Sequence, residues 1–124
     1  MKEYDELINQ LAQATDSNAI TWELSSGRFY DGKVDAPYGI TRAFSTTYEG
    51  QNFVLIEKRV LVYDNDYDES VERLIVNLCL FDPGNNLMSE LTNNDFSYGY
   101  LSILVKKVTD QVSKLAIQKF LKKK

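Results

Sequence analysis

The fold is decided by residues 40–81, which read ITRAFSTTYEGQNFVLIEKRVLVYDNDYDESVERLIVNLCLF. Three runs in this stretch, at about 40–48, 53–63 and 71–81, are rich in the β-branched and aromatic residues that favour strands. Two short polar segments, 49–52 and 64–70, separate the runs. Because connections this short join antiparallel neighbours, the stretch predicts a β-meander.

Helices are predicted on either side of the meander. Residues 2–14 place Tyr4, Leu7, Ile8 and Leu11 on one stripe at helical spacing. Residues 97–121 predict a longer helix, with apolar residues three or four positions apart: Leu101, Val105, Val108, Val112 and Leu115. Such a stripe also occurs in coiled-coil dimers, but packing against the chain's own sheet is the preferred interpretation.

The segment before the meander adds at least one more strand. Ile20, Trp22 and Leu24 alternate with polar residues, as in a half-buried strand. Residues 26–39 are turn-rich, with a further short strand expected at 28–30. We therefore predict a single α+β domain over residues 1–124, an antiparallel β-meander of four to five strands with an N-terminal helix and a long C-terminal helix packed on one face.

The loops predict which side chains share a face of the sheet. A symmetric closure of the 64–70 loop puts a set of mainly aliphatic residues together: Val54, Ile56, Val60, Val62, Leu74, Val76, Leu78 and Leu80. A four-residue loop at 49–52 adds four small residues to the same face: Thr41, Ala43, Ser45 and Thr47. We predict that this face is the core and that both helices cover it. A slip of one residue would exchange the two faces.

The opposite face is the predicted partner-binding surface. It gathers the following polar and aromatic residues: Arg42, Arg59, Arg73, Glu57, Asn77, Phe44 and Tyr48. In the same register Arg42 lies opposite Arg59, so that three arginines surround Glu57. Arginine forks beside aromatic rings suit a partner that carries carboxylates or phosphates. Alternatively, Glu57 only neutralises the arginines while their stems cover apolar surface.

The residues that most enzymes rely on are missing from this chain. It contains no histidine and no glycine-rich phosphate loop. Cys79 lies mid-strand without a basic neighbour in sequence and is read as a small, half-buried apolar residue. The acidic loop at 64–69 is similar to the start of an EF-hand, but Glu69 and Ile75 replace its glycine and its closing glutamate. We therefore expect no catalytic residues, no cofactor and weak or no calcium binding.

The composition of the chain limits the classes of partner and the cellular location that are expected for the protein. The net charge is −4, which argues against nucleic-acid binding despite the lysines at 119 and 122–124. The lysine-rich end is interpreted as favourable pairing with a helix C-terminus rather than as a membrane or phosphate contact. One cysteine permits no internal disulfide. No apolar run approaches the ~20 residues of a membrane span, and the N-terminus has no secretory pattern. A cytoplasmic location is expected.

Together these features favour a non-catalytic binding module: a small adaptor, inhibitor or immunity-type protein that meets a protein partner through an exposed sheet face. One alternative is a small enzyme or anionic-ligand-binding protein that uses carboxylates and arginines. Another is a structural homo-oligomer. A homodimer is slightly favoured, because Trp22, the stripe on the second helix and the aromatic sheet face are more apolar surface than one small domain easily hides.

Overall fold

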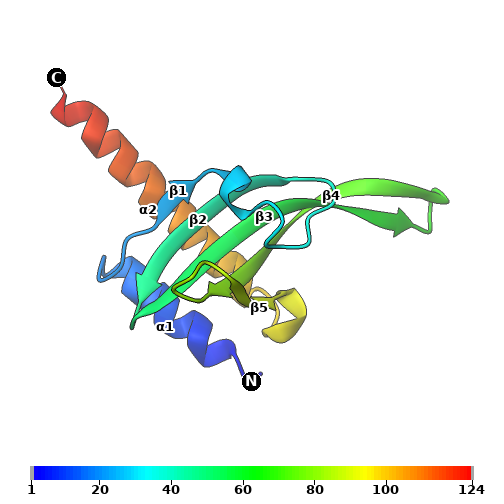
Figure 1. Ribbon diagram of the computed structural model, residues 1–124, viewed down its shortest axis with the longest axis horizontal. Helices are drawn as coiled ribbons and strands as arrows, with labels where there is room; N and C mark the ends of the chain where they lie inside the picture. Colours follow the sequence, from blue (N-terminus) through cyan, green and yellow to red (C-terminus); the bar gives the residue numbers. More distant parts are fainter. Residues whose placement is uncertain (1, 124) are drawn as a thin grey trace.

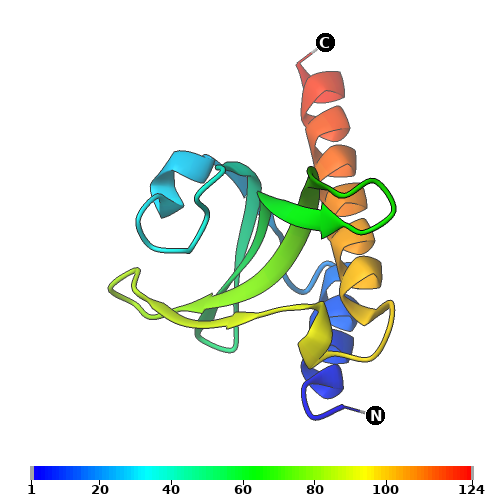
Figure 2. The ribbon, with the colours of Figure 1, turned by 90° about the vertical axis from the view of Figure 1, so that its right-hand side faces the viewer.

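The computed structural model describes residues 2–123. One α-helix precedes the five strands in the sequence and the other follows them. Two short 3-10 helices lie in the connections, one between the first and second strands and one between the last strand and the second α-helix. The elements are α1 (Asp5–Asp16), β1 (Glu23–Ser25), η1 (Gly27–Tyr30), β2 (Ile40–Tyr48), β3 (Gln51–Asp64), β4 (Glu69–Phe81), β5 (Leu87–Leu91), η2 (Asn93–Asp95) and α2 (Tyr100–Lys122). Both α-helices lie on one side of the sheet, while η1 and the β4–β5 turn project from the other side (Figures 1 and 2).

The five strands form one antiparallel sheet in the order β1-β2-β3-β4-β5. Each strand therefore pairs with its neighbour in the sequence, as in a meander. This confirms the predicted α+β fold with a helix at each end. Two local predictions are corrected: residues 28–30 belong to the 3-10 helix η1, and β5 lies in a stretch that showed no strand pattern.

The turn between β2 and β3 is tighter than predicted. Tyr48 pairs with Gln51, so that only Glu49 and Gly50 form the turn. Both have positive φ, 52° and 75°, which is typical of a type I′ turn and matches the twist of the strands. The expected four-residue loop would have shifted the pairing by two residues. A shift of two leaves every side chain on the same face, so this error has no effect on the predicted faces.

The turn between β3 and β4 has a larger consequence. Asp64 pairs with Glu69, which leaves four residues in the turn rather than a symmetric arrangement about Tyr67. Asp68 adopts a φ of 50°, and the Asp66 amide donates to Asp64 Oδ1 at 3.0 Å. The register differs by one residue from the prediction. All β4 side chains are therefore exchanged between faces relative to those of β3.

The helix-covered face combines residues that had been assigned to opposite faces. Leu78 pairs with Leu55, and both are buried with Phe44 and Phe53 under the helices. The helices contribute Ile8, Leu11, Leu101, Leu104 and Val108 to this core. Val76 and Leu80 pack against the same core, as predicted. Leu74 is not part of this core, because its side chain is 58% exposed and lines an open surface pocket beside α2.

The other face of the sheet is also covered, which contradicts the prediction that it is open. Residues 26–39 cross it and bury Tyr30 and Val34 against the strands. The sheet residues beneath them are Ala43, Val54, Ile56, Cys79 and Phe81. Ala43, Val54 and Ile56 are therefore core residues, but they do not lie under the helices. The centre of the sheet is buried on both faces.

Buried polar contacts join α2 to the segment that connects α1 with β1. Gln111 of α2 accepts a hydrogen bond from the Trp22 amide at 2.9 Å and donates to the Ile20 carbonyl at 2.9 Å. The Trp22 indole donates to Thr15 at 2.9 Å, so this side chain is hidden within the monomer. Leu101 and Val108 from the stripe on α2 are buried in the same way. Intramolecular packing therefore hides much of the apolar surface that suggested a homodimer.

Asp5, the first residue of α1, makes a second polar contact between the N-terminal and C-terminal parts of the chain. Its side chain accepts hydrogen bonds from the Ser97 amide at 2.8 Å and the Ser97 hydroxyl at 2.5 Å. Burial opposes ionisation of Asp5, but these hydrogen bonds and one from the Lys2 amide outweigh it and lower its pKa. The carboxylate thus fixes the connection between η2 and α2 against α1.

Candidate functional site

Arg42 and Glu57 are brought together, but not in the predicted way. They are direct cross-strand partners, and the guanidinium donates from Nε and Nη2 to the two carboxylate oxygens at 3.2 and 3.0 Å. Thr41 donates to the same carboxylate at 2.9 Å. The hydrogen bond from Arg42 holds the pKa of Glu57 below its usual range, and Thr41 adds to this effect. The Arg42 guanidinium also lies 5.3 Å from the centre of the Phe44 ring.

The other two arginines do not surround Glu57. Arg59 Nε lies 2.9 Å from Glu72 Oε1, in a pair that is exposed to solvent. Arg73 pairs with Val60, and the one-residue change of register puts it on the opposite face from Arg59. The predicted gathering of three arginines around one glutamate is therefore wrong. Each of Arg42 and Arg59 has a carboxylate of its own.

Three of the predicted site residues are largely covered. Phe44 lies in the core beneath the helices, and Tyr48 packs against that core while remaining half-buried. Asn77 is buried on the other face, where its amide donates to Glu90 Oε2 at 2.7 Å. The exposed part of the predicted surface thus consists of Arg42, Arg59 and Arg73. A partner-binding role for these arginines stays a prediction.

A projecting hairpin arm, defined as residues 59–74, carries Arg59 and Arg73, while Arg42 lies just outside it, opposite Glu57. The first residue of β2, Ile40, pairs with Lys58, and β5 pairs with β4 only from Leu78 onward, so the arm is a two-stranded ribbon. Figure 1 shows it extending well beyond the rest of the sheet. Five large apolar side chains along it are 45–74% exposed: Leu61, Val62, Tyr63, Tyr67 and Leu74. The arm could have been expected from the sequence, because the second and third strands of the meander are longer than their neighbour at 40–48.

The tip of the arm carries the acidic loop. The Tyr63 hydroxyl hydrogen-bonds to Asp68, and Asp64 accepts from the backbone of Asp66. Within residues 2–123, no group of three or more histidine, cysteine or acidic side chains is placed to hold a metal ion. The loop is thus a solvent-exposed turn with several acidic side chains.

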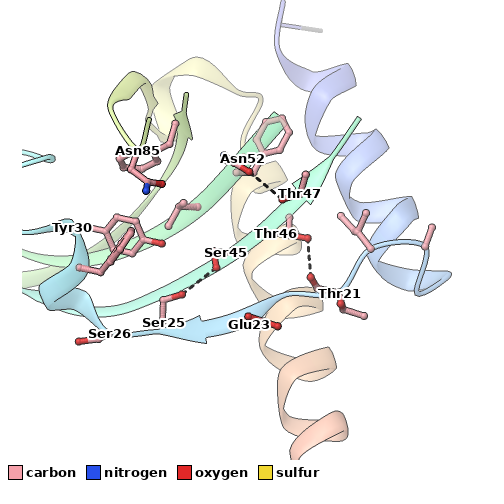
Figure 3. Close-up of a pocket in the computed structure, with 16 residues that line it drawn as sticks. Thr21, Glu23, Ser25, Ser26, Tyr30, Ser45, Thr46, Thr47, Asn52 and Asn85 are labelled. Carbon is pink, nitrogen blue, oxygen red and sulfur yellow. Dashed lines mark hydrogen bonds between the residues drawn. The ribbon is translucent and has the colours of Figure 1, made fainter. Parts of the chain in front are cut away.

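An open cleft of ≈ 780 Å³ lies on the sheet face opposite the helices (Figure 3). Its floor comes from β1, β2, β3 and β4, and its rim from η1 and the β4–β5 turn. Hydroxyl groups dominate the floor: Ser25 and Ser45 are hydrogen-bonded at 3.1 Å, and Thr47 donates to Asn52 at 3.0 Å. The face had been predicted to carry small residues such as Ser45 and Thr47, but nothing in the sequence placed η1 above them.

A buried ion pair lies on the same face. Lys58 Nζ lies 2.9 Å from Glu90 Oε2, and it also donates to the Asp35 carbonyl at 2.5 Å. Because Asp35 belongs to the segment that crosses the sheet, Lys58 attaches this segment to β3. Asn77 completes the cluster through its hydrogen bond to Glu90. Each polar group in the cluster has a partner, as buried charges require.

Cys79 lies beside this cluster and is expected to be unreactive in the folded protein. Burial raises the pKa of its thiol to about 12, and the nearby Glu90 carboxylate adds to the effect. At pH 8 only about one thiol in ten thousand would be ionised, and the thiolate is the reactive form. Ellman's reagent should therefore modify the native protein very slowly and the urea-unfolded protein at once. Rapid modification of the native protein would contradict this prediction.

The chain matches no protein-family model, no curated protein and no solved structure. Neither α1 nor α2, nor any other helix within residues 2–123, combines the length and hydrophobicity that crossing a bilayer requires.

Proposed function

We propose that the protein is a non-catalytic binding module that meets a protein partner through the arm, which includes Arg59, and through the neighbouring residue Arg42. The observation that carries this proposal is the exposure of five large apolar side chains on one projecting ribbon. Exposed apolar residues gathered in this way typify interaction surfaces. They contrast with the centre of the sheet, where both faces are buried.

The backbone of the arm supports the same proposal. The Arg59 amide donates to the Gly39 carbonyl at 3.1 Å. Beyond it, no strand among residues 2–123 pairs with the outer edges of residues 60–64 and 69–74, which therefore present open amide and carbonyl groups. An extended segment of a partner can add to such an edge by main-chain hydrogen bonds, while side chains on alternate positions give specificity. Long, open edges are usually protected in proteins that do not use them.

Arg42 and Arg59 supply a polar border to this apolar surface. Their side chains are 46% and 45% exposed although each is paired with a carboxylate. An arginine in an exposed pair retains donors that can reach a second acceptor. A partner with carboxylates next to apolar residues would therefore fit the helix-facing side of the arm, where Leu61, Tyr63 and Leu74 continue from Arg59.

Photo-crosslinking in the native host tests this proposal. Benzoylphenylalanine at position 61 should give a discrete covalent adduct, whose second component mass spectrometry identifies. The matched control is position 88 on β5, because Met88 is 60% exposed but lies away from the arm. With the identified partner, Arg59→Ala should weaken binding by about 2 kcal/mol, which is about 30-fold. Its free energy of unfolding should stay within about 0.5 kcal/mol of the wild-type value.

Two results would contradict the proposal. One is the same set of adducts from positions 61 and 88. The other is unchanged affinity for the partner when Arg42, Arg59 and Arg73 are all replaced by alanine.

Self-association is a second candidate function, and the distribution of charge favours it. The tip of the arm is acidic, with Asp64, Asp66 and Asp68, whereas the end of α2 carries Lys119, Lys122 and Lys123. Lys124 lies outside the described residues. These two ends point away from each other in Figure 1, and Ile117 and Leu121 are each 60% exposed near the basic end. Contact between them would be head-to-tail, and a crosslinked dimer from position 61 would identify it.

A further inference from the structure

The cleft opposite the helices has the size and lining of a small-molecule site. Its volume of ≈ 780 Å³ falls within the usual range of about 300–1,000 Å³ for ligand pockets. Val54 and Phe81 give it an apolar base, and Phe29 at the rim is 53% exposed. Hydroxyl and amide groups from β1, β2, β3 and the β4–β5 turn surround this base. Such a combination of apolar and convergent polar groups is what small polar ligands need.

Tyr30 is the strongest sign that the cleft accommodates a ligand. The residue is only 4% exposed, and its ring is held by Phe81 at 5.4 Å and by Phe29 at 5.0 Å between ring centres. Its hydroxyl makes no hydrogen bond with any described residue, yet it is not a fully buried atom. Figure 3 shows this hydroxyl directed into the cleft, toward the side of β2 that carries Ser45. A fixed ring thus presents one unused donor and acceptor.

Other polar groups around the cleft are also available. Asn52 uses its oxygen to accept from Thr47, which leaves its two amide hydrogens as donors. Asn85 lies across the cleft on the β4–β5 turn, and its side-chain amide has no partner among residues 2–123. Donors and acceptors therefore converge from three separate elements. A ligand that both donates and accepts would satisfy them best.

The charge of the cleft limits the class of ligand. Among the described residues that line it, Glu23 alone is charged, and its carboxylate forms no ion pair within residues 2–123. A lone carboxylate repels anions, which argues against phosphates and acidic peptides. The remaining polar groups are hydroxyls and amides, which pair well with hydroxyls. The Lys33 ammonium lies over the Phe29 ring, 4.8 Å from its centre. The ring is still 53% exposed, and its remaining surface can pack against the C–H groups of a sugar ring, because the face of an aromatic ring is electron-rich.

We propose that this cleft binds a small uncharged ligand with several hydroxyl groups, of the kind that a monosaccharide presents. Tyr30, Asn52 and Asn85 hydrogen-bond to the ligand, and Phe29 packs against its apolar side. The site is separate from the arm and does not depend on the proposed protein partner.

Titration of the ¹⁵N-labelled protein with glucose, galactose and N-acetylglucosamine, each to tens of millimolar, tests this proposal. We expect saturable shifts of the amides of Ser25, Tyr30 and Asn85, and none along the arm. Tyr30→Phe removes only the hydroxyl and should weaken binding by about fivefold, the effect of one hydrogen bond. Tyr67→Phe is the matched control, because Tyr67 lies exposed at the tip of the arm, and it should bind as the wild type does.

The outcomes separate the proposal from its alternatives. Asn85 lies on an exposed turn, so Asn85→Ala provides a second variant if Tyr30→Phe does not fold. The proposal is overturned if none of the sugars shifts the cleft amides. It is also overturned if both cleft variants bind as tightly as the wild type, or if phosphate or methylammonium perturbs the cleft more strongly than the sugars do.

Discussion

Replacing Leu78 by alanine is expected to lower the free energy of unfolding by about 2–5 kcal/mol, the usual range for a buried leucine. Leu78 is 0% exposed and lies on β4 beneath the helices, between Leu55 of β3 and Leu91 of β5. Its removal leaves a cavity in the layer that also holds Leu101 and Leu104. Urea unfolding followed by far-UV circular dichroism measures the change.

Leu74→Ala is the matched control for Leu78→Ala. It removes the same atoms from the same strand and the same face of the sheet, but Leu74 is 58% exposed on the arm. A surface substitution of this kind usually changes stability by no more than about 0.5 kcal/mol. If the two variants lost the same free energy of unfolding, Leu74 would have to be part of the core, which would contradict the structure. Leu74→Ala should instead weaken partner binding if the arm is the binding surface.

The elements of the fold could be predicted from local patterns. The range predicted for the first strand of the meander, 40–48, agrees with β2, which spans Ile40–Tyr48. Both α-helices were also expected, with ends that differ by one to three residues. This success has a physical basis, because hydrophobic periodicity is a local property of the sequence. Short turns then leave an antiparallel meander as the simplest arrangement.

The faces of the sheet could not be predicted because they depend on one residue in one turn. The acidic turn of four residues at 65–68 and a symmetric turn about Tyr67 are both compatible with the sequence. They differ only in whether Asp64 pairs with Glu69 or with Ser70. That difference decides whether Leu78 shares a face with Leu55 or with Ile56. Arg73 left the predicted arginine cluster for the same reason. Arg42 faces Glu57 rather than Arg59 for another reason, because the β2–β3 turn has two residues instead of four.

The sequence also contains a signal that both faces of the sheet are covered. Residues 53–56, Phe-Val-Leu-Ile, and 78–81, Leu-Cys-Leu-Phe, are continuously apolar. Continuous apolar runs are typical of strands that are buried on both faces, whereas a sheet with one exposed face shows alternation. The second face is covered by the turn-rich segment 26–39, whose few apolar residues follow neither a helical nor a strand period. The cleft beneath η1 therefore became visible only in the structure.

Lys58→Met is expected to cost about 3 kcal/mol of folding free energy, because it removes one partner of a buried ion pair. The side chains of Lys58 and Glu90 are 9% and 19% exposed, so the variant would leave the Glu90 carboxyl group in a poorly hydrated place without its ammonium partner. Asp35 and Glu90 would both lose the ammonium group to which they bind. Urea unfolding measures the loss, and Lys58→Met/Glu90→Gln should recover part of it because no unpaired charge then remains.

Arg59→Met provides a sharp comparison, because Arg59 is the next residue and its ion pair has the same length of 2.9 Å. The pair with Glu72 is exposed, and exposed pairs contribute only about 0–1 kcal/mol. Burial rather than pairing should therefore decide the difference between the two variants. Lys58→Met should also loosen the segment that carries Tyr30, since the contact with Asp35 is lost. Faster hydrogen exchange at the Lys33 and Val34 amides would report this loosening, whereas unchanged stability and exchange would show that Lys58 does not attach the segment to the sheet.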